Sequence, residues 1–400
     1  MSTSKSRRKF LKSTAAAGAL GGVSASSASP AGGKQRNGAG IYARLGVRPV
    51  INGVGTVTVL GGSIMPEEVV RAMDEASRHF VPLPELQRKA GEHIAGLLKI
   101  PGALVTTGAA GAITIATVAC MTRGDRRKLR RLPDVADTKH EIVIQKTHRS
   151  GYEGQILLAG AKLVWVETMD ELTAAINDRT AMMFFLNKAD PDGQIKRAEW
   201  IRVGKERGVP TFNDAAADVP PVSRLTSVVE EGFDLVAFSG GKGLLGPQCS
   251  GLLLGRKDLV DAGFEAQSPY GGIGRGMKVG KEEIVGLIAA VERYLKVDHA
   301  AERRLLDTRA AEMMDGLSKI KGVETRKDVP EIANNVPHVV VEWDESSRKQ
   351  ASQDVVKQLL EGNPPISVSR MGEGKLRISM WMLRGTEHRT IARRLKEIFG

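Results

Sequence analysis

The chain has 400 residues, of which 42% are hydrophobic and 26% charged, an ordinary composition for a globular protein with a large core. Its formal net charge is +12, but five cationic side chains lie within the first dozen residues, so roughly +7 remains for the rest. That modest excess, together with an aromatic content of only 4%, does not indicate a nucleic-acid-binding protein.

The N-terminal segment 1–31 is predicted to be a twin-arginine export signal. It contains Ser6-Arg-Arg-Lys-Phe-Leu-Lys12, followed by a weakly apolar Ala/Gly stretch and a small-residue region suited to signal peptidase. A disordered basic tail is the alternative. Residues 32–40 are predicted to form a linker. We therefore expect an extracytoplasmic or periplasmic protein, exported in folded form by the twin-arginine machinery and without a stable membrane anchor.

From Ile41 onward the sequence predicts an α/β domain. The first expected elements are helices over 66–80 and 85–99, a strand over 103–106 and a helix up to Met121. Strands are then expected over 141–145, 162–166, 181–186, 209–213, 235–238 and 251–255, with helices over 151–159, 169–176 and 197–207. This alternation predicts parallel βαβ units and a mainly parallel sheet with helices on both faces.

The pattern changes beyond about residue 280. A long helix over 281–307 is expected, followed by a smaller α+β domain. Its expected strands are 338–343, 366–369 and 376–380, and its expected helices are 350–361 and 387–399. We therefore assign an N-terminal arm and large domain to 41–290, and an interdomain helix with a small C-terminal domain to 291–400.

The most informative segment is Asp234-Leu-Val-Ala-Phe-Ser-Gly-Gly-Lys242. A short apolar strand ends in a glycine-rich turn that presents one lysine, and desolvation there favours a neutral amine able to form a Schiff base. Upstream, another buried strand ends at Asp214. A lysine for the Schiff base and an aspartate for the pyridinium nitrogen are the pair that pyridoxal 5'-phosphate (PLP) needs. The alternatives are a solvated loop lysine and an aspartate that only caps a turn or a helix.

Other residues are candidates for contact with the same cofactor. The segment Thr107-Gly108-Ala109 joins a strand to a helix, so its backbone N–H groups can bind the phosphate, and the hydroxyl of Ser239 can join them. His148 follows a strand and is expected to stack on the pyridine ring, unless it is a surface-loop histidine.

Three residues are candidates for binding the substrate. Asn187 follows a strand and is expected to face the cofactor or the substrate, or else to form a turn. Arg377 suits bidentate capture of a substrate carboxylate. Arg275, in a flexible cationic loop, suits a phosphate, including one bound across a dimer interface. Exposed surface charges are the alternative for both arginines. The cysteine and histidine spacings predict no metal site.

The chain resembles the selenocysteine synthase-like branch of fold type I PLP enzymes. The matching segments are Glu85-Leu-Gln-Arg-Lys-Ala-Gly91, Thr106-Thr-Gly-Ala-Ala110, His148-Arg-Ser-Gly-Tyr152, Asp214, and Ser239-Gly-Gly-Lys242 with Gly246-Pro-Gln248. Within this branch the chain is most similar to the subgroup that includes D-glucosaminate-6-phosphate ammonia-lyase. The resemblance implies the PLP-dependent transferase fold with a seven-stranded type of sheet, an internal aldimine at Lys242, an Asp214–pyridinium pair and active sites at a homodimer interface.

The expected activity is that of a PLP-dependent lyase of the ammonia-lyase or dehydratase type, acting on an amino acid or amino-sugar acid through a carbanion at Cα. An L-seryl-tRNA selenium transferase is the alternative, although export and the lack of room for an N-terminal tRNA-binding domain argue against it. Racemase, aldolase and aminotransferase reactions stay open. A non-catalytic PLP-fold binding protein is disfavoured because Lys242 and Asp214 are both present. We expect a small-molecule substrate, a homodimer or higher homo-oligomer, and no nucleic acid.

Overall fold

The computed structural model describes residues 40–400, so the predicted export signal and all but the last residue of the predicted linker lie outside the described residues. The chain divides into a unit up to Pro49 and a second unit from Val50 to Gly400. The described part of the first unit contains a short helix, α1 (Ile41–Arg44), with exposed side chains. Within residues 40–400, no helix is long and apolar enough to cross a membrane.

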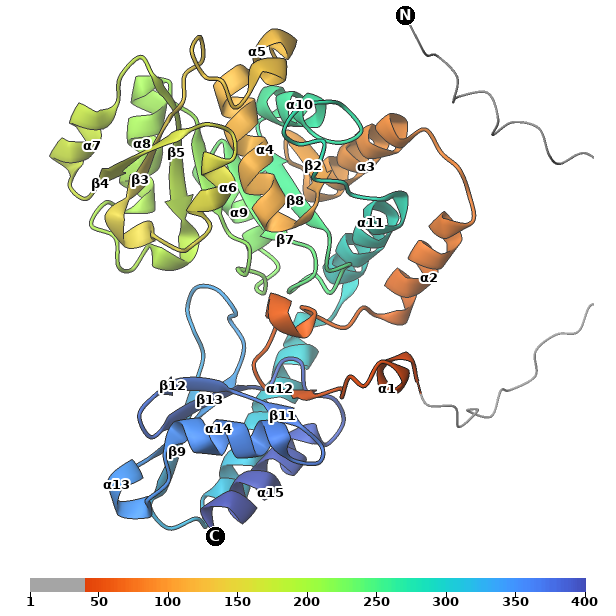
Figure 1. Cartoon of the computed structure of the whole chain (residues 1–400), viewed down its shortest axis with the longest axis vertical. Helices are drawn as coiled ribbons and strands as arrows, with labels where there is room; N and C mark the ends of the chain where they lie inside the picture. The colour runs from red at the N-terminus through yellow and green to blue at the C-terminus, as the bar shows by residue number, and fades with distance from the viewer. Residues whose placement is uncertain (1–39) are drawn as a thin grey trace, which may run out of the picture. The chain divides into compact units, whose positions relative to one another are not determined.

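A seven-stranded sheet forms the centre of the large domain, with the strand order β2, β8, β7, β6, β5, β3, β4 (Figure 1). These strands are β2 (Gly102–Thr106), β3 (Glu141–Gln145), β4 (Lys162–Val166), β5 (Thr180–Leu186), β6 (Thr211–Asp214), β7 (Leu235–Ser239) and β8 (Gly251–Gly255). β8 is antiparallel to both of its neighbours, and the other neighbouring pairs are parallel. The predicted α/β fold with a mainly parallel sheet is confirmed.

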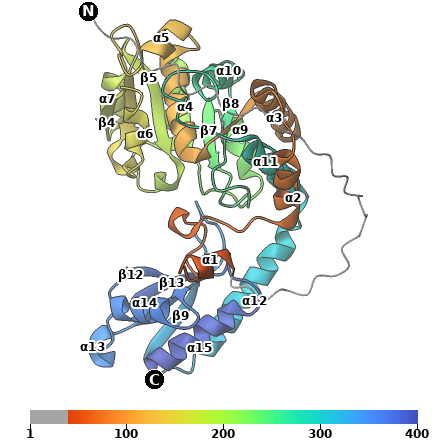
Figure 2. The same cartoon turned by 45° about the vertical axis from the view of Figure 1, so that its right-hand side comes forward.

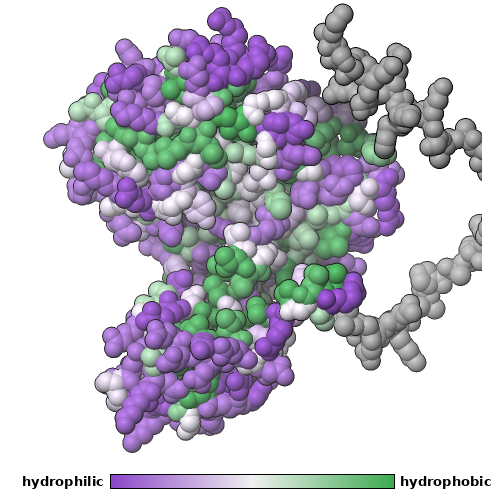
Figure 3. Space-filling view, viewed as in Figure 1, coloured by the Kyte–Doolittle hydropathy of each residue, from purple (hydrophilic) through white to green (hydrophobic). Residues whose placement is uncertain are grey.

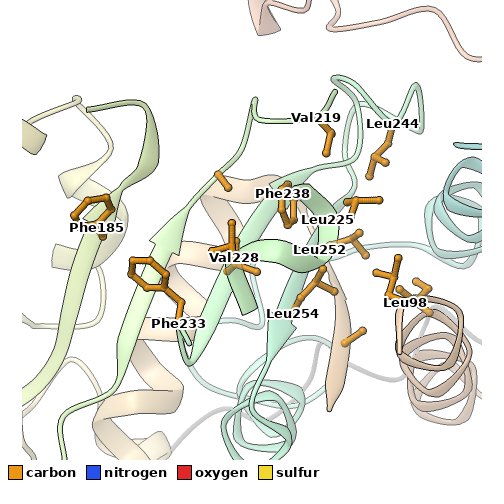
Figure 4. Close-up of a cluster of buried hydrophobic side chains, with 14 of the residues drawn as sticks. Leu98, Phe185, Val219, Leu225, Val228, Phe233, Phe238, Leu244, Leu252 and Leu254 are labelled. Carbon is orange, nitrogen blue, oxygen red and sulfur yellow. The ribbon is translucent and has the colours of Figure 1, made fainter. Parts of the chain in front are cut away.

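Helices cover both faces of this sheet, because successive strand residues point to opposite faces. In β5, Phe185 belongs to one buried hydrophobic cluster and Phe184 to the other. The Phe185 cluster, part of which Figure 4 shows, includes residues of α2 (Glu67–Ser77), α3 (Leu83–Leu98), α7 (Met169–Ala175), α8 (Arg197–Arg207), α9 (Arg224–Glu231) and α11 (Lys281–Lys296). The Phe184 cluster includes residues of α4 (Gly108–Thr122), α5 (Arg126–Arg131), α6 (Glu153–Leu157) and α10 (Lys257–Ala266).

The small domain is built on a four-stranded antiparallel sheet with the order β12, β13, β10, β9. Its strands are β9 (Val323–Asp328), β10 (His338–Trp343), β12 (Ser369–Gly372) and β13 (Lys375–Ser379). Its helices are α12 (His299–Leu317), α13 (Glu345–Arg348), α14 (Ser352–Glu361) and α15 (Glu387–Phe399). α12 and α15 lie side by side (Figure 2), and both contribute to the hydrophobic core of this domain.

Two differences between the structure and the sequence predictions concern the division into domains. The expected helix over 281–307 is interrupted: α11 ends at Lys296, Val297 is extended, and the Asp298 carboxylate accepts a hydrogen bond from Ala301 N (2.8 Å) as the N-cap of α12. The N-terminal arm also contributes to the small domain. Its strand β1 (Ile51–Asn52) pairs in parallel with β11 (Ile366–Ser367), and Ile51 lies in the small-domain core, although we had grouped residues 41–290 together.

Candidate active site

The predicted cofactor residues come together at the carboxyl-terminal edge of the large sheet. β6 ends at Asp214, β7 ends at Ser239, and Thr107 follows directly after β2. The carboxyl ends of parallel strands meet at one edge, which is where ligands bind in open α/β sheets. Lys242 lies on the turn that follows β7, so it reaches the same edge.

A cavity of about 210 Å³ occupies this edge and matches the predicted cofactor site. All of the predicted cofactor-binding residues except His148 line it: Thr107, Gly108, Ala109, Asp214, Ser239 and Lys242. The remaining lining residues are Thr56, Thr58, Gly62, Ala110, Ile113, Tyr152, Ala216, Gly241 and Gln248.

The amino terminus of α4 opens into this cavity. The helix begins at Gly108, and its N-cap residue Thr107 makes no side-chain capping hydrogen bond. Gly108 has φ +74, a left-handed conformation that favours glycine. The first backbone N–H groups of a helix are unsatisfied by the helix itself and carry its positive dipole end, so this position suits a phosphate.

The Lys242 turn depends on close backbone contact. A Cβ atom at Gly243 would lie 2.0 Å from the carbonyl oxygen of Val219, and one at Gly241 would lie 2.6 Å from Gln248 Cα. Only glycine fits at either position without moving the backbone. The glycines around Lys242 therefore let this turn pack directly against the segment that follows β6.

Burial dominates the electrostatics of the two central groups. It lowers the pKa of the Lys242 ammonium, although Asp214 and Asp218 act in the opposite direction. It raises the pKa of the Asp214 carboxyl, although the backbone N–H of Ala216 (3.1 Å from Oδ1) and the charge of Lys242 oppose the rise. The Ala216 contact is the turn-capping role we had considered as the alternative for Asp214.

A second cavity, of about 440 Å³, adjoins the first. Asp214, Lys242 and Tyr152 line both. Its remaining walls come from segment 54–59, from the ends of the large-domain strands, and from the small domain, which contributes His338, Ser369, Arg377 and Ser379. Its volume lies in the range of small-molecule sites. The structure therefore places Arg377, the predicted carboxylate ligand, in the same cavity as Lys242.

These residues fit PLP. Among the described residues, Lys242 Nζ has no hydrogen-bond or ion-pair partner and Asp214 Oδ2 has no hydrogen-bond donor, although both side chains are largely buried. Unpaired buried charges are costly, so a bound group that pairs with both relieves that cost. An aldehyde, a pyridinium nitrogen and a phosphate match the free amine, the free carboxylate oxygen and the uncapped helix terminus, respectively.

Known proteins of related sequence support the same interpretation. The family described as L-seryl-tRNA selenium transferase matches residues 156–327. D-Glucosaminate-6-phosphate ammonia lyase of Salmonella typhimurium is 29% identical over 371 residues, covering 90% of this chain and 97% of that protein. The solved structure of a D-glucosaminate-6-phosphate ammonia-lyase aligns with a TM-score of 0.78 at 29% identity, over 92% of this chain and 99% of that one.

A 5'-C-glycyluridine monooxygenase-decarboxylase of a Streptomyces species is 32% identical over 375 residues, covering 89% of this chain and 91% of that protein. The chain belongs to the selenocysteine synthase-like branch of fold type I PLP enzymes. Its cofactor is PLP.

In this PLP enzyme, His148 does not line either cavity. Its ring is fully buried and packs edge-on against Phe185, with 4.4 Å between the ring centroids, and its Nδ1 accepts a hydrogen bond from Leu186 N (3.1 Å). Burial lowers the pKa of His148 to about 4. The aromatic side chain that does line the cofactor cavity is Tyr152, which belongs to the same His-Arg-Ser-Gly-Tyr segment.

Asn187 and Arg275, two of the predicted substrate ligands, also lie outside the cavity walls. Asn187 is fully buried, and its amide is hydrogen-bonded to other buried polar groups. It donates to Asp218 Oδ2 and accepts from Asn213 Nδ2 (3.2 Å). Arg275 is exposed on the loop between α10 and α11 and lines neither cavity of its own chain.

The polar residues of the site that were not predicted from the sequence include Lys188, Asp218 and Gln248. Lys188 and Asp218 line the larger cavity, and Gln248 lines the smaller one. The sequence held a signal for two of them. Gln248 ends the Gly246-Pro-Gln248 segment used for the family resemblance, and Asp218 repeats the carboxylate of Asp214 four residues later, beyond the strand end.

Proposed function

We propose that the protein is a PLP-dependent lyase that eliminates a substituent from the β-carbon of a carboxylate-bearing amine and releases ammonia and an oxo acid. The substrate would be an amino acid or an amino-sugar acid. The observation that carries the proposal is the shared wall of the two cavities. Lys242 and Asp214 line the cofactor cavity, and both also line the larger cavity, which contains Arg377.

Each residue has a distinct task in this reaction. Lys242 and Asp214 would hold the cofactor together with the start of α4. When bound, PLP withdraws electrons from the substrate Cα and makes the proton there removable. Because burial lowers its pKa, Lys242 is suited to take that proton as a neutral amine. Arg377 would bind the substrate carboxylate through its planar guanidinium, which matches a carboxylate bidentately.

The relatives support this class of substrate without deciding it. D-Glucosaminate-6-phosphate ammonia lyase, by its name, acts on an amino-sugar acid. The 32% identity to the Streptomyces enzyme favours a second candidate, an oxidative decarboxylation that consumes oxygen, as the name monooxygenase-decarboxylase states. The two reactions have different products, so measuring ammonia, carbon dioxide and oxygen consumption with the same substrates separates them.

The first test is an absorption spectrum of the purified protein with and without PLP. We expect a visible band from lysine-bound cofactor that Lys242→Ala abolishes. A panel of D- and L-amino acids and D-glucosaminate 6-phosphate should then be screened for spectral change and for release of ammonia and oxo acid. A wild-type protein that binds PLP but releases ammonia from no member of the panel would contradict the lyase proposal.

We also propose export by the twin-arginine route, on the basis of Arg7-Arg8 with Phe10-Leu11. A double Arg7→Lys, Arg8→Lys variant should stay in the cytoplasm, folded and loaded with PLP, while the wild-type protein reaches the extracytoplasmic fraction. Equal export of the two proteins would contradict this proposal.

We propose, finally, that the enzyme forms a homodimer. Large hydrophobic side chains are exposed on the second unit, and Figure 3 shows green areas between the hydrophilic ones. Val59, which lines the larger cavity, is 90% exposed, and Phe80 is fully exposed. Exposed apolar surface of this kind favours association. Sedimentation velocity should show a dimer that Phe80→Asp weakens, and a wild-type monomer at micromolar concentration would contradict the proposal.

A further inference from the structure

A second buried carboxylate, Asp218, faces only the substrate side of the site. It lines the larger cavity but not the smaller one, whereas Asp214 and Lys242 line both. A turn that follows β6, with Asp218 N donating to the Ala215 carbonyl oxygen (3.0 Å), brings the two carboxylates to one wall. The Asp218 side chain is almost fully buried, at 2% exposure.

One oxygen of Asp218 is held by the amide of Asn187, which is itself held by the amide of Asn213. Asn187 Nδ2 donates to Asp218 Oδ2, and Asn213 Nδ2 in turn donates to Asn187 Oδ1 (3.2 Å). Asn187 and Asn213 are fully buried, so this arrangement is shielded from water. Because Oδ2 accepts from an amide N–H, a proton on Asp218 would reside on Oδ1, which has no hydrogen-bond partner among the described residues.

The surroundings of Asp218 favour its protonated form. No cation among residues 40–400 lies within ion-pair distance of it. Burial raises its pKa to about 6, and the neighbouring charge of Asp214 adds to the rise, while Asn187, Arg224 and Arg197 oppose it. Beside Asp214, the other ionisable groups that line its cavity are Lys242, Lys188, His338, Arg377 and Tyr152.

We propose that Asp218 is the general acid that protonates the departing group when that group is a hydroxyl on the β-carbon of the substrate. The inference rests on the proposed lyase function. The Cα–H bond breaks, its proton passes to Lys242 Nζ and its electron pair becomes the Cα–Cβ double bond. The Cβ–O bond breaks with its pair on oxygen, which takes the proton from Asp218 Oδ1 and leaves as water.

The test compares substrates that need an acid with substrates that do not. Serine, in both enantiomers, and D-glucosaminate 6-phosphate lose a hydroxyl, whereas β-chloroalanine loses chloride, which departs without a proton. In PLP-loaded Asp218→Asn, ammonia release from the β-hydroxy substrates should fall by about 10²-fold or more, while release from β-chloroalanine stays within a few-fold of wild type. Exchange of the Cα proton of serine in D2O, followed by NMR, should also continue.

A second measurement does not depend on activity. With PLP removed, the stability of the wild-type protein relative to Asp218→Asn should fall as the pH rises from 4 to 8, because the wild-type carboxyl must ionise while buried. The matched control is Asp192→Asn, which changes an exposed aspartate that lines neither cavity and should behave as wild type in every assay.

The outcomes separate the inference from the function on which it rests. Equal losses on serine and β-chloroalanine, or full activity of Asp218→Asn on β-hydroxy substrates, would overturn the acid role and leave the lyase function standing. If the wild-type enzyme releases ammonia from neither kind of substrate, the lyase function is wrong and the role of Asp218 falls with it.

Discussion

Substitution of Gly251 by alanine should disturb the cofactor site, because Gly251 packs directly against the backbone at the start of α4. Gly251 begins β8, and a Cβ atom there would lie 2.4 Å from Gly108 C and 2.8 Å from Ala109 N, the backbone that starts α4. Ordinary contact to a Cβ begins near 3.4 Å, so one backbone must move by about 1 Å. No rotamer can relieve the clash because each nearest atom belongs to the main chain.

Overpacking of this kind costs about 1–3 kcal/mol. If the start of α4 moves, the phosphate loses its aligned N–H donors. A loss of the same size in the free energy of PLP binding corresponds to an affinity weakened by about tenfold to a hundredfold. Absorbance titration of the apoprotein with PLP, together with thermal unfolding, measures both effects.

The control is Gly96→Ala on the exposed face of α3, where nothing lies within 4 Å of the added Cβ. It should leave PLP affinity unchanged and stabilise the protein by up to about 1 kcal/mol. Wild-type PLP affinity in Gly251→Ala would refute the assignment of the phosphate to the amino terminus of α4, even if the variant unfolds more easily.

Three further outcomes are expected. Asp214→Asn should retain PLP but lose about 10²-fold or more in turnover, because it removes the charge opposite the ring nitrogen, and near-normal turnover would remove that role. Arg377→Ala should raise KM tenfold or more for carboxylate-bearing substrates; Lys375→Ala, on the same strand but paired with Glu342 (2.7 Å), should not. His148 has a pKa lowered from 6.5 to about 4, so on acidification the unfolded chain binds a proton at this residue before the folded chain does. Between pH 6.5 and pH 4 the wild type should therefore lose about 3 kcal/mol of stability relative to His148→Gln. Chemical denaturation measures this difference, and parallel pH profiles of the two proteins would contradict it.

Local patterns in the sequence were sufficient to predict most of the large domain. The strands Glu141–Gln145 and Gly251–Gly255 and the helix Arg197–Arg207 were predicted with the bounds that the structure shows. Their apolar runs or 3.6-residue periodicity lie within one short segment, so no distant partner is needed to recognise them. Lys242 and Asp214 were predicted for a similar reason: each follows a buried strand at a glycine- or alanine-rich turn, and parallel strands present such positions at one edge.

Only the tertiary structure decided which side chains enter the cavities. Asn187 also follows a strand, yet it lines neither cavity. Its amide pairs with Asp218 and Asn213, because buried polar groups must be paired with whatever neighbours the fold supplies. His148 is likewise enclosed against Phe185 rather than at the cavity wall. The pairing of Ile51 with Ile366 and the position of Arg377 in the same cavity as Lys242 depend on segments far apart in the chain. The sequence therefore determined which elements form and which groups stand at their ends, whereas long-range packing determined the direction of each side chain and hence its role.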